Sequence, residues 1–141
     1  MILLDTDHLT VLRYPESPRH SAFLERMESS VDQAFCTTIV NIEEQLRGWL
    51  ALIHRTRDVD KQIPVYERLA KLVAFFAKWE ILPWDDRATA QWRLLSRART
   101  RIGAQDLKIA SIALAHDALL LSANLRDFRR VPRLRVESWV E

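Results

Sequence analysis

The chain of 141 residues has few glycines and only one cysteine, and each shortage excludes a class of protein. With two glycines it cannot build the glycine-rich loops that bind dinucleotides or nucleoside triphosphates. Cys36 lies in an apolar run typical of a buried strand, and one cysteine forms no internal disulfide. No apolar run approaches the roughly 18 residues of a membrane helix, and no export signal is visible. The sequence therefore predicts a cytoplasmic protein without a membrane span.

Composition predicts one folded domain covering residues 1–141. Hydrophobic residues make up 48% of the chain, which is enough for one buried core. The formal charge is only +2, but arginine supplies 17 of the 21 basic residues. Because the guanidinium group suits phosphate, this excess is a weak indication of nucleic-acid binding; an arginine-rich solvated surface is the other interpretation.

Short apolar runs alternate with helical patterns along the chain. Strands are predicted at residues 1–4, 34–37, 81–84, 119–122 and 135–140, the last as an edge strand. Helices are predicted from residue 18 to about 27 and over residues 41–57, 63–77, 85–101 and 104–116. Strands separated by helices favour a three-layer α/β/α fold around a central, mainly parallel sheet of four to five strands.

Two long amphipathic patterns predict an antiparallel helical hairpin. The stripe of the first helix consists of Ile42, Leu46, Trp49, Leu50 and Ile53. The stripe of the second consists of Ile63, Tyr66, Leu69, Ala70, Val73 and Ala77. A third helix, after Asp85 and Asp86, is expected to run through Ala90, Leu94 and Ala98. Spacings of three and four residues place each set on one helix face.

Acidic or amide side chains lie close after several predicted strands or at the start of helices. They are Asp5, the pair Glu43 and Glu44, Asp106, and Asn124 with Asp127. In parallel sheets ligands bind beyond the carboxyl ends of strands, so these side chains are candidates for one site. Converging carboxylates repel unless a cation lies between them, and hard oxygen ligands suit Mg²⁺ or Mn²⁺. For Glu43, Glu44 and Asp106, simple stabilisation of a helix N-terminus is the alternative.

Four segments together resemble a known family. They are Leu3-Leu-Asp-Thr-Asp7, Glu44-Gln-Leu-Arg-Gly48, Gln105-Asp-Leu-Lys-Ile-Ala110 and Ser122-Ala-Asn-Leu-Arg-Asp-Phe128. In this order they resemble the PIN-domain ribonucleases, and more narrowly the VapC-type toxins of bacterial toxin–antitoxin pairs. The resemblance covers essentially the whole chain and implies a single PIN-like nuclease domain.

The resemblance assigns the first acid to Asp5 and the second to Glu44, which stands four residues before Gly48. Helical geometry agrees with the second assignment, because 100° per residue places Glu44 almost opposite the apolar stripe of its helix. The same geometry also fits a glutamate that merely faces solvent.

The third acid falls on Asp106, and the fourth is ambiguous. Some relatives carry an acid where this chain has Asn124, whereas others carry it three residues later, at Asp127; we favour Asp127. The expected metal ligands and catalytic residues are thus Asp5, Glu44, Asp106 and Asp127. Hydrogen bonds or an outer-shell water are expected to involve Thr6, Asp7, Ser122 and Asn124.

The resemblance implies Mg²⁺- or Mn²⁺-dependent hydrolysis of RNA phosphodiesters by the toxin of a toxin–antitoxin pair. It also implies a cognate antitoxin and a homodimer as partners. Phosphates would meet cations around the acids, with Arg47, Arg101, Lys108 and Arg126 as weak candidates. Two alternatives remain: a catalytically degenerate PIN-fold binding module, and a different Mg²⁺-dependent phosphohydrolase with Asp5 as nucleophile.

Overall fold

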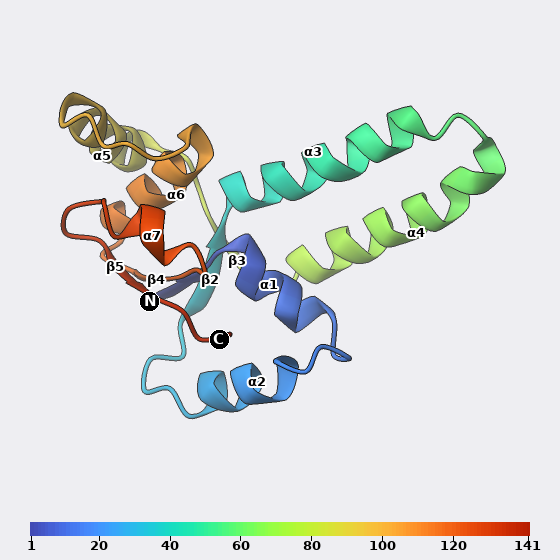
Figure 1. The fold of residues 1–141 in the computed structure, drawn as a ribbon, viewed down its shortest axis with the longest axis horizontal. Helices are drawn as coiled ribbons and strands as arrows, with labels where there is room; N and C mark the ends of the chain where they lie inside the picture. The colour runs from blue at the N-terminus through green and yellow to red at the C-terminus, as the bar shows by residue number, and fades with distance from the viewer.

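A five-stranded parallel sheet organises the molecule, and the computed structural model describes every residue from 1 to 141 (Figure 1). The strands are β1 (Ile2–Leu4), β2 (Phe35–Thr38), β3 (Glu80–Leu82), β4 (Leu119–Leu121) and β5 (Arg135–Glu137). Their order across the sheet is β3-β2-β1-β4-β5, and every neighbouring pair is parallel. The predicted α/β class and strand number are confirmed. The edge strand ends at Glu137, three residues earlier than predicted.

Seven helices surround this sheet. They are α1 (Thr6–Arg13), α2 (His20–Glu28), α3 (Ile39–Arg55), α4 (Val59–Phe76), α5 (Asp86–Arg97), α6 (Ala104–Ala115) and α7 (Leu125–Phe128). No helix is long and apolar enough to cross a membrane.

The central strand β1 faces two separate apolar cores. Leu3 belongs to a core with residues of α5 and α6, whereas Ile2 and Leu4 belong to a second core with residues of α1, α2 and α4. All three side chains are buried, because alternate residues of a strand point to opposite faces of a sheet covered on both sides. The predicted three-layer arrangement is therefore confirmed.

The predicted helical hairpin consists of α3 and α4, which project together from the sheet as an arm (Figure 1). At 17 residues, α3 is about 25 Å long at 1.5 Å per residue. The side chains of Thr38 and Asp58 cap the N-termini of α3 and α4. The junction between β2 and α3 is thus fixed where the chain leaves the sheet.

The apolar stripe predicted for α4 is wrong. Tyr66 and Val73 of that stripe are more than half exposed. The buried side chains of the helix are instead Val65, Leu72 and Phe76. Apolar residues occupy both faces of α4, so periodicity alone did not determine which face meets the body. On α3 the predicted stripe is half-buried, except for Leu50, which is 49% exposed.

Two short helices, α1 and α7, were not predicted. Both begin shortly after a strand, in segments considered from the sequence only for their acidic residues. The buried face of α5 also differs from the prediction: Ala88 and Leu95 are buried, whereas Leu94 is half exposed. The added helices matter for the site, because α1 begins at Thr6 and α7 includes Asp127.

Candidate active site

The site lies at the carboxyl ends of β1 and β4, where the strand order changes direction. The chain passes from β1 outward to β2 and β3, and then returns to place β4 on the other side of β1. Leu4 pairs with Leu121 in parallel register, and the backbone N–H of Asp5 donates to the carbonyl of Leu121 at 2.9 Å. Asp5 and Ser122 therefore follow neighbouring strands at the switch point, the usual ligand position in such sheets.

Asp5 is a buried carboxylate held by three donors. Its Oδ1 accepts hydrogen bonds from the amide of Asn41 and the backbone N–H of Thr6, both at 2.9 Å. Its Oδ2 accepts from the hydroxyl of Ser122 at 2.8 Å. Burial raises the pKa of Asp5, the charge of Asp7 raises it further, and the three donors oppose the shift without cancelling it. The carboxylate is thus fixed in position but costly to ionise without a cation.

Asn41 was missed in the sequence and is fully buried beside Asp5. Thr38 orients it: the Thr38 hydroxyl donates to the Asn41 side-chain oxygen at 2.6 Å and accepts the Asn41 backbone N–H at 3.1 Å. The Asn41 amide also donates to the Thr6 hydroxyl oxygen at 3.2 Å. A polar residue in the first turn after a strand is the signal that marks Asn41, but only acids were considered there.

Asp7 lies close enough to Asp5 for its charge to raise the pKa of Asp5, and its carboxylate fixes the loop after β4. Its carboxylate accepts the backbone N–H of Ala123 at 2.9 Å and contacts the Nδ1 of buried His8 at 2.5 Å. The backbone N–H of Trp139 donates to His8 Nε2 at 3.0 Å, which places the hydrogen of His8 on Nδ1, facing Asp7. Burial raises the pKa of Asp7, but the hydrogen bonds from His8 and Ala123 outweigh it and lower the pKa.

Glu44 and Asp106 bring further negative charge towards Asp5 from α3 and α6. Burial, followed by the charges of Asp5 and Asp106, raises the pKa of Glu44 from its ordinary value of 4.5 to about 7. Burial and the charge of Asp5 likewise raise the pKa of Asp106. None of these three acids forms an ion pair within 4 Å. They form one electrostatic cluster with uncompensated negative charge.

The structure brings both candidates for the fourth acidic position to this cluster. The side-chain amide of Asn124 donates to Asp106 Oδ2 at 3.1 Å and to Asp127 Oδ2 at 3.2 Å. Asn124 precedes α7, but its side chain forms no capping hydrogen bond with that helix. Its side chain therefore does not act as a helix cap. Asp127 also lies 3.8 Å from the guanidinium of Arg130. Asn124 therefore links Asp127 to Asp106.

The donor set fits a hard divalent cation. Asp5, Glu44, Asp106 and Asp127 offer only carboxylate oxygens, the ligand type that Mg²⁺ and Mn²⁺ take. In the arrangement described, no three acidic, histidine or cysteine side chains surround one point at ligand distance. The acids nevertheless raise one another's pKa, so a cation among them would relieve a repulsion that the fold imposes.

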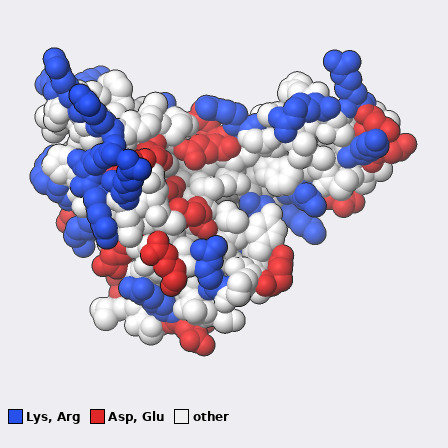
Figure 2. Space-filling model, viewed as in Figure 1, with Lys and Arg blue, Asp and Glu red and all other residues white.

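Of the four basic residues predicted to contact phosphates around the acids, two interact with neighbouring side chains. Arg47 pairs with Glu43, which also accepts the Gln105 amide at 2.8 Å and so ties α3 to the start of α6. The Nζ of Lys108 lies 5.9 Å from the ring centre of Trp84. Arg101 and Arg126 are exposed. Figure 2 shows red acidic atoms where the arm meets the body and blue basic atoms over the side of α5 and α7.

Comparisons with known proteins define the class. The PIN domain family matches residues 2–134. The chain is 31% identical over 94 residues to the tRNA(fMet)-specific endonuclease VapC of Salmonella typhimurium, covering 64% of this chain and 71% of that protein. It is 32% identical over 85 residues to ribonuclease VapC2 of Rickettsia felis, covering 57% of this chain and 63% of that protein.

Solved structures have the same fold. VapBC-1 from nontypeable Haemophilus influenzae superposes with a TM-score of 0.76 at 19% identity, over the whole of both chains. VapBC2 from Rickettsia felis, bound to a DNA fragment from its promoter, superposes with a TM-score of 0.72 at 23% identity, over 99% of both chains. The chain belongs to the PIN domain family, and the two relatives named above are VapC nucleases.

Proposed function

We propose that this protein is an endoribonuclease that hydrolyses RNA phosphodiester bonds with Mg²⁺ or Mn²⁺ and acts as the toxin of a toxin–antitoxin pair. The observation that carries the proposal is the unpaired cluster of Asp5, Glu44 and Asp106 at the switch point of the sheet. Ribonuclease relatives and the PIN family match support the same reaction class.

Asp5, Glu44, Asp106 and Asp127 would hold the metal. A divalent ion supplies an activated water and neutralises charge on the phosphate and the leaving oxygen. Asp5 is fixed for this role by Ser122, Asn41 and Thr6, so little reorganisation is needed when its carboxylate binds.

Two residues position the remaining acids. The Asn124 amide holds Asp106 and Asp127 at 3.1 and 3.2 Å, which keeps two carboxylates from different helices facing the same point. The Gln105 amide donates to Glu43 at 2.8 Å and Arg47 pairs with it, so Glu43 already has partners and Glu44 is the glutamate available to the metal. The raised pKa of Glu44 means that metal binding and loss of its proton are coupled.

We further propose an antitoxin and a second copy of the chain as partners. The superposed solved structures are VapBC complexes, some bound to DNA, which supports an antitoxin partner. Exposed apolar side chains on α4, including Ile63, Tyr66 and Val73, support self-association through the arm. An RNA substrate, together with the buried free thiol of Cys36, fits the predicted cytoplasmic location.

The test is RNA cleavage by purified, antitoxin-free protein with Mg²⁺ or Mn²⁺, with EDTA, and after Asp106→Asn. We expect EDTA to abolish cleavage and Asp106→Asn to reduce its rate by roughly a hundredfold or more, since a metal ligand is lost. Asp86→Asn is the matched control, because Asp86 also lies in the first turn of a helix but is exposed.

Other outcomes would contradict the proposal. Equal cleavage in all three conditions would indicate a contaminant or another chemistry. No cleavage of varied RNAs with either metal would favour the degenerate binding module. Phosphate trapped covalently on Asp5 would instead identify an aspartyl phosphohydrolase.

A further inference from the structure

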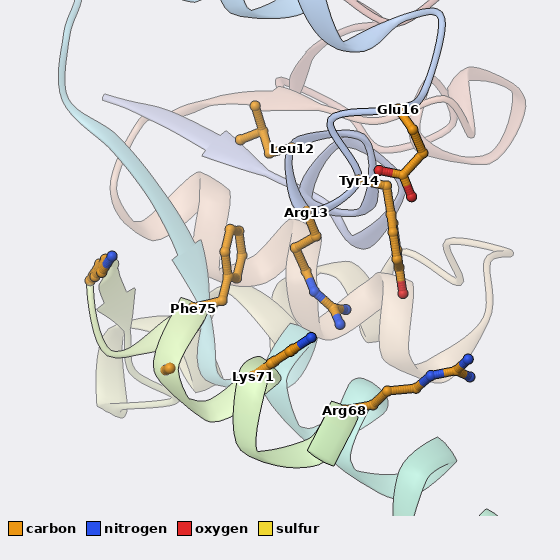
Figure 3. A pocket seen from close by; sticks show the side chains of 9 residues that line it. Leu12, Arg13, Tyr14, Glu16, Arg68, Lys71 and Phe75 are labelled. Atoms are coloured by element: carbon orange, nitrogen blue, oxygen red, sulfur yellow. The ribbon is translucent and has the colours of Figure 1, made fainter. Parts of the chain in front are cut away.

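A groove between α1 and α4 lies outside the acidic cluster and has not been assigned a role. It has a volume of about 740 Å³ and lies against the end of α1 and the loop that follows it (Figure 3). Arg13 and Lys71 reach into it from opposite sides, while Tyr14 and Arg68 border its outer end (Figure 3). We call it the α1–α4 groove.

The α1–α4 groove carries uncompensated positive charge. Arg13, Arg68, Lys71 and Lys78 line it, and none of them forms an ion pair within 4 Å. Glu16 is the one carboxylate in the lining. Like charges held together without counter-ions favour an anion between them, and several such charges in a row favour a polyanion.

Two aromatic rings accompany these cations. The ring centres of Tyr14 and Phe75 lie 5.5 and 6.0 Å from the guanidinium carbon of Arg13, and Tyr14 is 41% exposed. An exposed ring among cations offers a nucleic-acid strand both a surface for base stacking and charges for its phosphates. An acidic peptide would use the charges but has no base to stack, so the lining favours single-stranded RNA.

Gln45 lies between the groove and the neighbourhood of the acidic cluster. The guanidinium of Arg13 donates to the Gln45 side-chain oxygen at 3.4 Å. Gln45 and Glu44 also line a second depression, of about 440 Å³, that runs past Gly48. A Cβ atom at Gly48 would meet no other atom within 4 Å, so the depression is open at that position. An RNA strand bound in the groove would pass Gln45 and then reach Glu44 through this depression.

We propose that the α1–α4 groove binds the single-stranded part of the RNA that enters the active site. Arg68 and Lys71 contact backbone phosphates, and Tyr14 stacks on a base. The proposal rests on the ribonuclease function proposed above, and it identifies a substrate-binding surface distinct from the predicted Arg47, Arg101, Lys108 and Arg126.

The test measures binding separately from cleavage. Full-length Asp106→Asn protein in EDTA is titrated against a fluorescein-labelled single-stranded RNA, and the Kd is read by anisotropy at several salt concentrations. Adding Arg68→Ala and Lys71→Ala should weaken binding about tenfold and reduce the slope of log K against log salt by about 1.4, for two phosphates at roughly 0.7 each. Tyr14→Ala should weaken binding, whereas Tyr14→Phe should preserve it, because the ring supplies the stacking.

The matched control is Arg57→Ala with Lys61→Ala, which removes the same charge from exposed positions at the outer end of the arm. An equal loss of affinity in this control, or none in the Arg68 and Lys71 variant, would overturn the proposal. The proposal would also be overturned if the Arg68 and Lys71 variant bound RNA normally but no longer bound an acidic antitoxin segment. The groove would then be a protein-binding surface.

Cleavage by the otherwise wild-type protein separates the two proposals. Arg68→Ala with Lys71→Ala should raise KM for long single-stranded RNA and leave kcat unchanged. If neither the wild-type protein nor its Arg68 and Lys71 variant cleaves RNA, while the binding difference is retained, the ribonuclease proposal is refuted and the groove stands as an RNA-binding surface.

Discussion

Three hydrogen-bond donors determine the position and orientation of the Asp5 carboxylate. Ser122, Asn41 and Thr6 come from three different segments, yet all donate to one carboxylate. Each donor favours the charged form, whereas burial and Asp7 oppose it, and the net pKa is raised. A cation is therefore the natural counterpart of this arrangement.

Removing one of these donors should weaken metal binding without unfolding the protein. We expect Ser122→Ala to lower the affinity for Mn²⁺ by about tenfold, the usual scale for the loss of a group that orients a ligand. Isothermal titration calorimetry measures this directly. Ser111→Ala is the control, because that equally buried hydroxyl bonds only to the Leu107 carbonyl within its own helix. Equal metal affinity in both variants would contradict the assigned role of Ser122.

The raised pKa of Glu44 predicts a pH-dependent stability for the metal-free protein. Its folded-state pKa of about 7 exceeds the ordinary 4.5, so the folded state binds the extra proton. The free energy of unfolding should therefore fall as pH rises from about 4.5 to about 7. Urea unfolding in EDTA at several pH values should show this fall, and Glu44→Gln should make it smaller. Glu67→Gln, at an exposed position on α4, should leave the fall intact.

At the scale of elements, the junction between β2 and α3 serves both the fold and the site. Thr38 ends the strand and caps the helix, and it holds the side chain of Asn41 against Asp5. The arm therefore cannot change its angle to the sheet without disturbing the bond between Asn41 and the carboxylate.

Thr38→Val should test this coupling. Valine keeps the shape but removes both hydrogen bonds to Asn41, which should cost about 1–2 kcal/mol in the free energy of unfolding. Urea denaturation measures the cost, and Mn²⁺ affinity should fall with it. Thr10→Val, at an exposed hydroxyl within α1, should change stability by less than about 0.5 kcal/mol. Unchanged metal affinity in Thr38→Val would separate the helix cap from the site.

For the whole molecule, charge and apolar surface are divided between regions. Acids gather where the arm meets the body, and basic residues cover the side of α5 and α7 (Figure 2). The arm leaves Ile63, Tyr66 and Val73 more than half exposed, and this surface supports the proposed self-association.

Self-association through the arm should depend on this surface. We expect a dimer in sedimentation velocity experiments whose dissociation constant rises about tenfold or more in Val73→Asp, since a charge would be buried at the contact. Val31→Asp, at a fully exposed position outside the arm, should not change it. A protein that stays monomeric at every concentration would refute the homodimer.

The sequence was most informative where a single local pattern was enough to identify a strand or a helix. The apolar run before Asp5 identified the central strand, and apolar residues spaced three and four apart located both helices of the arm. It failed at α1, α7 and the buried face of α4, where short elements and apolar residues on two faces left the pattern ambiguous. Among the site residues, the acids were visible as charges after strands, whereas Asn41 and His8 resembled ordinary polar residues.

The sequence by itself determined the alternation of strands and helices, and hence the parallel sheet with acids at its carboxyl edge, because periodicity and charge are local properties. Only the tertiary structure decided which groups meet. It placed Asn124 between Asp106 and Asp127, brought the Asp7 carboxylate to the backbone N–H of Ala123, and left Arg13 facing Lys71 across a groove. Except for the bond between Asn124 and Asp127, these contacts join residues far apart along the chain. They depend on how helices pack on the sheet, which no local pattern contains.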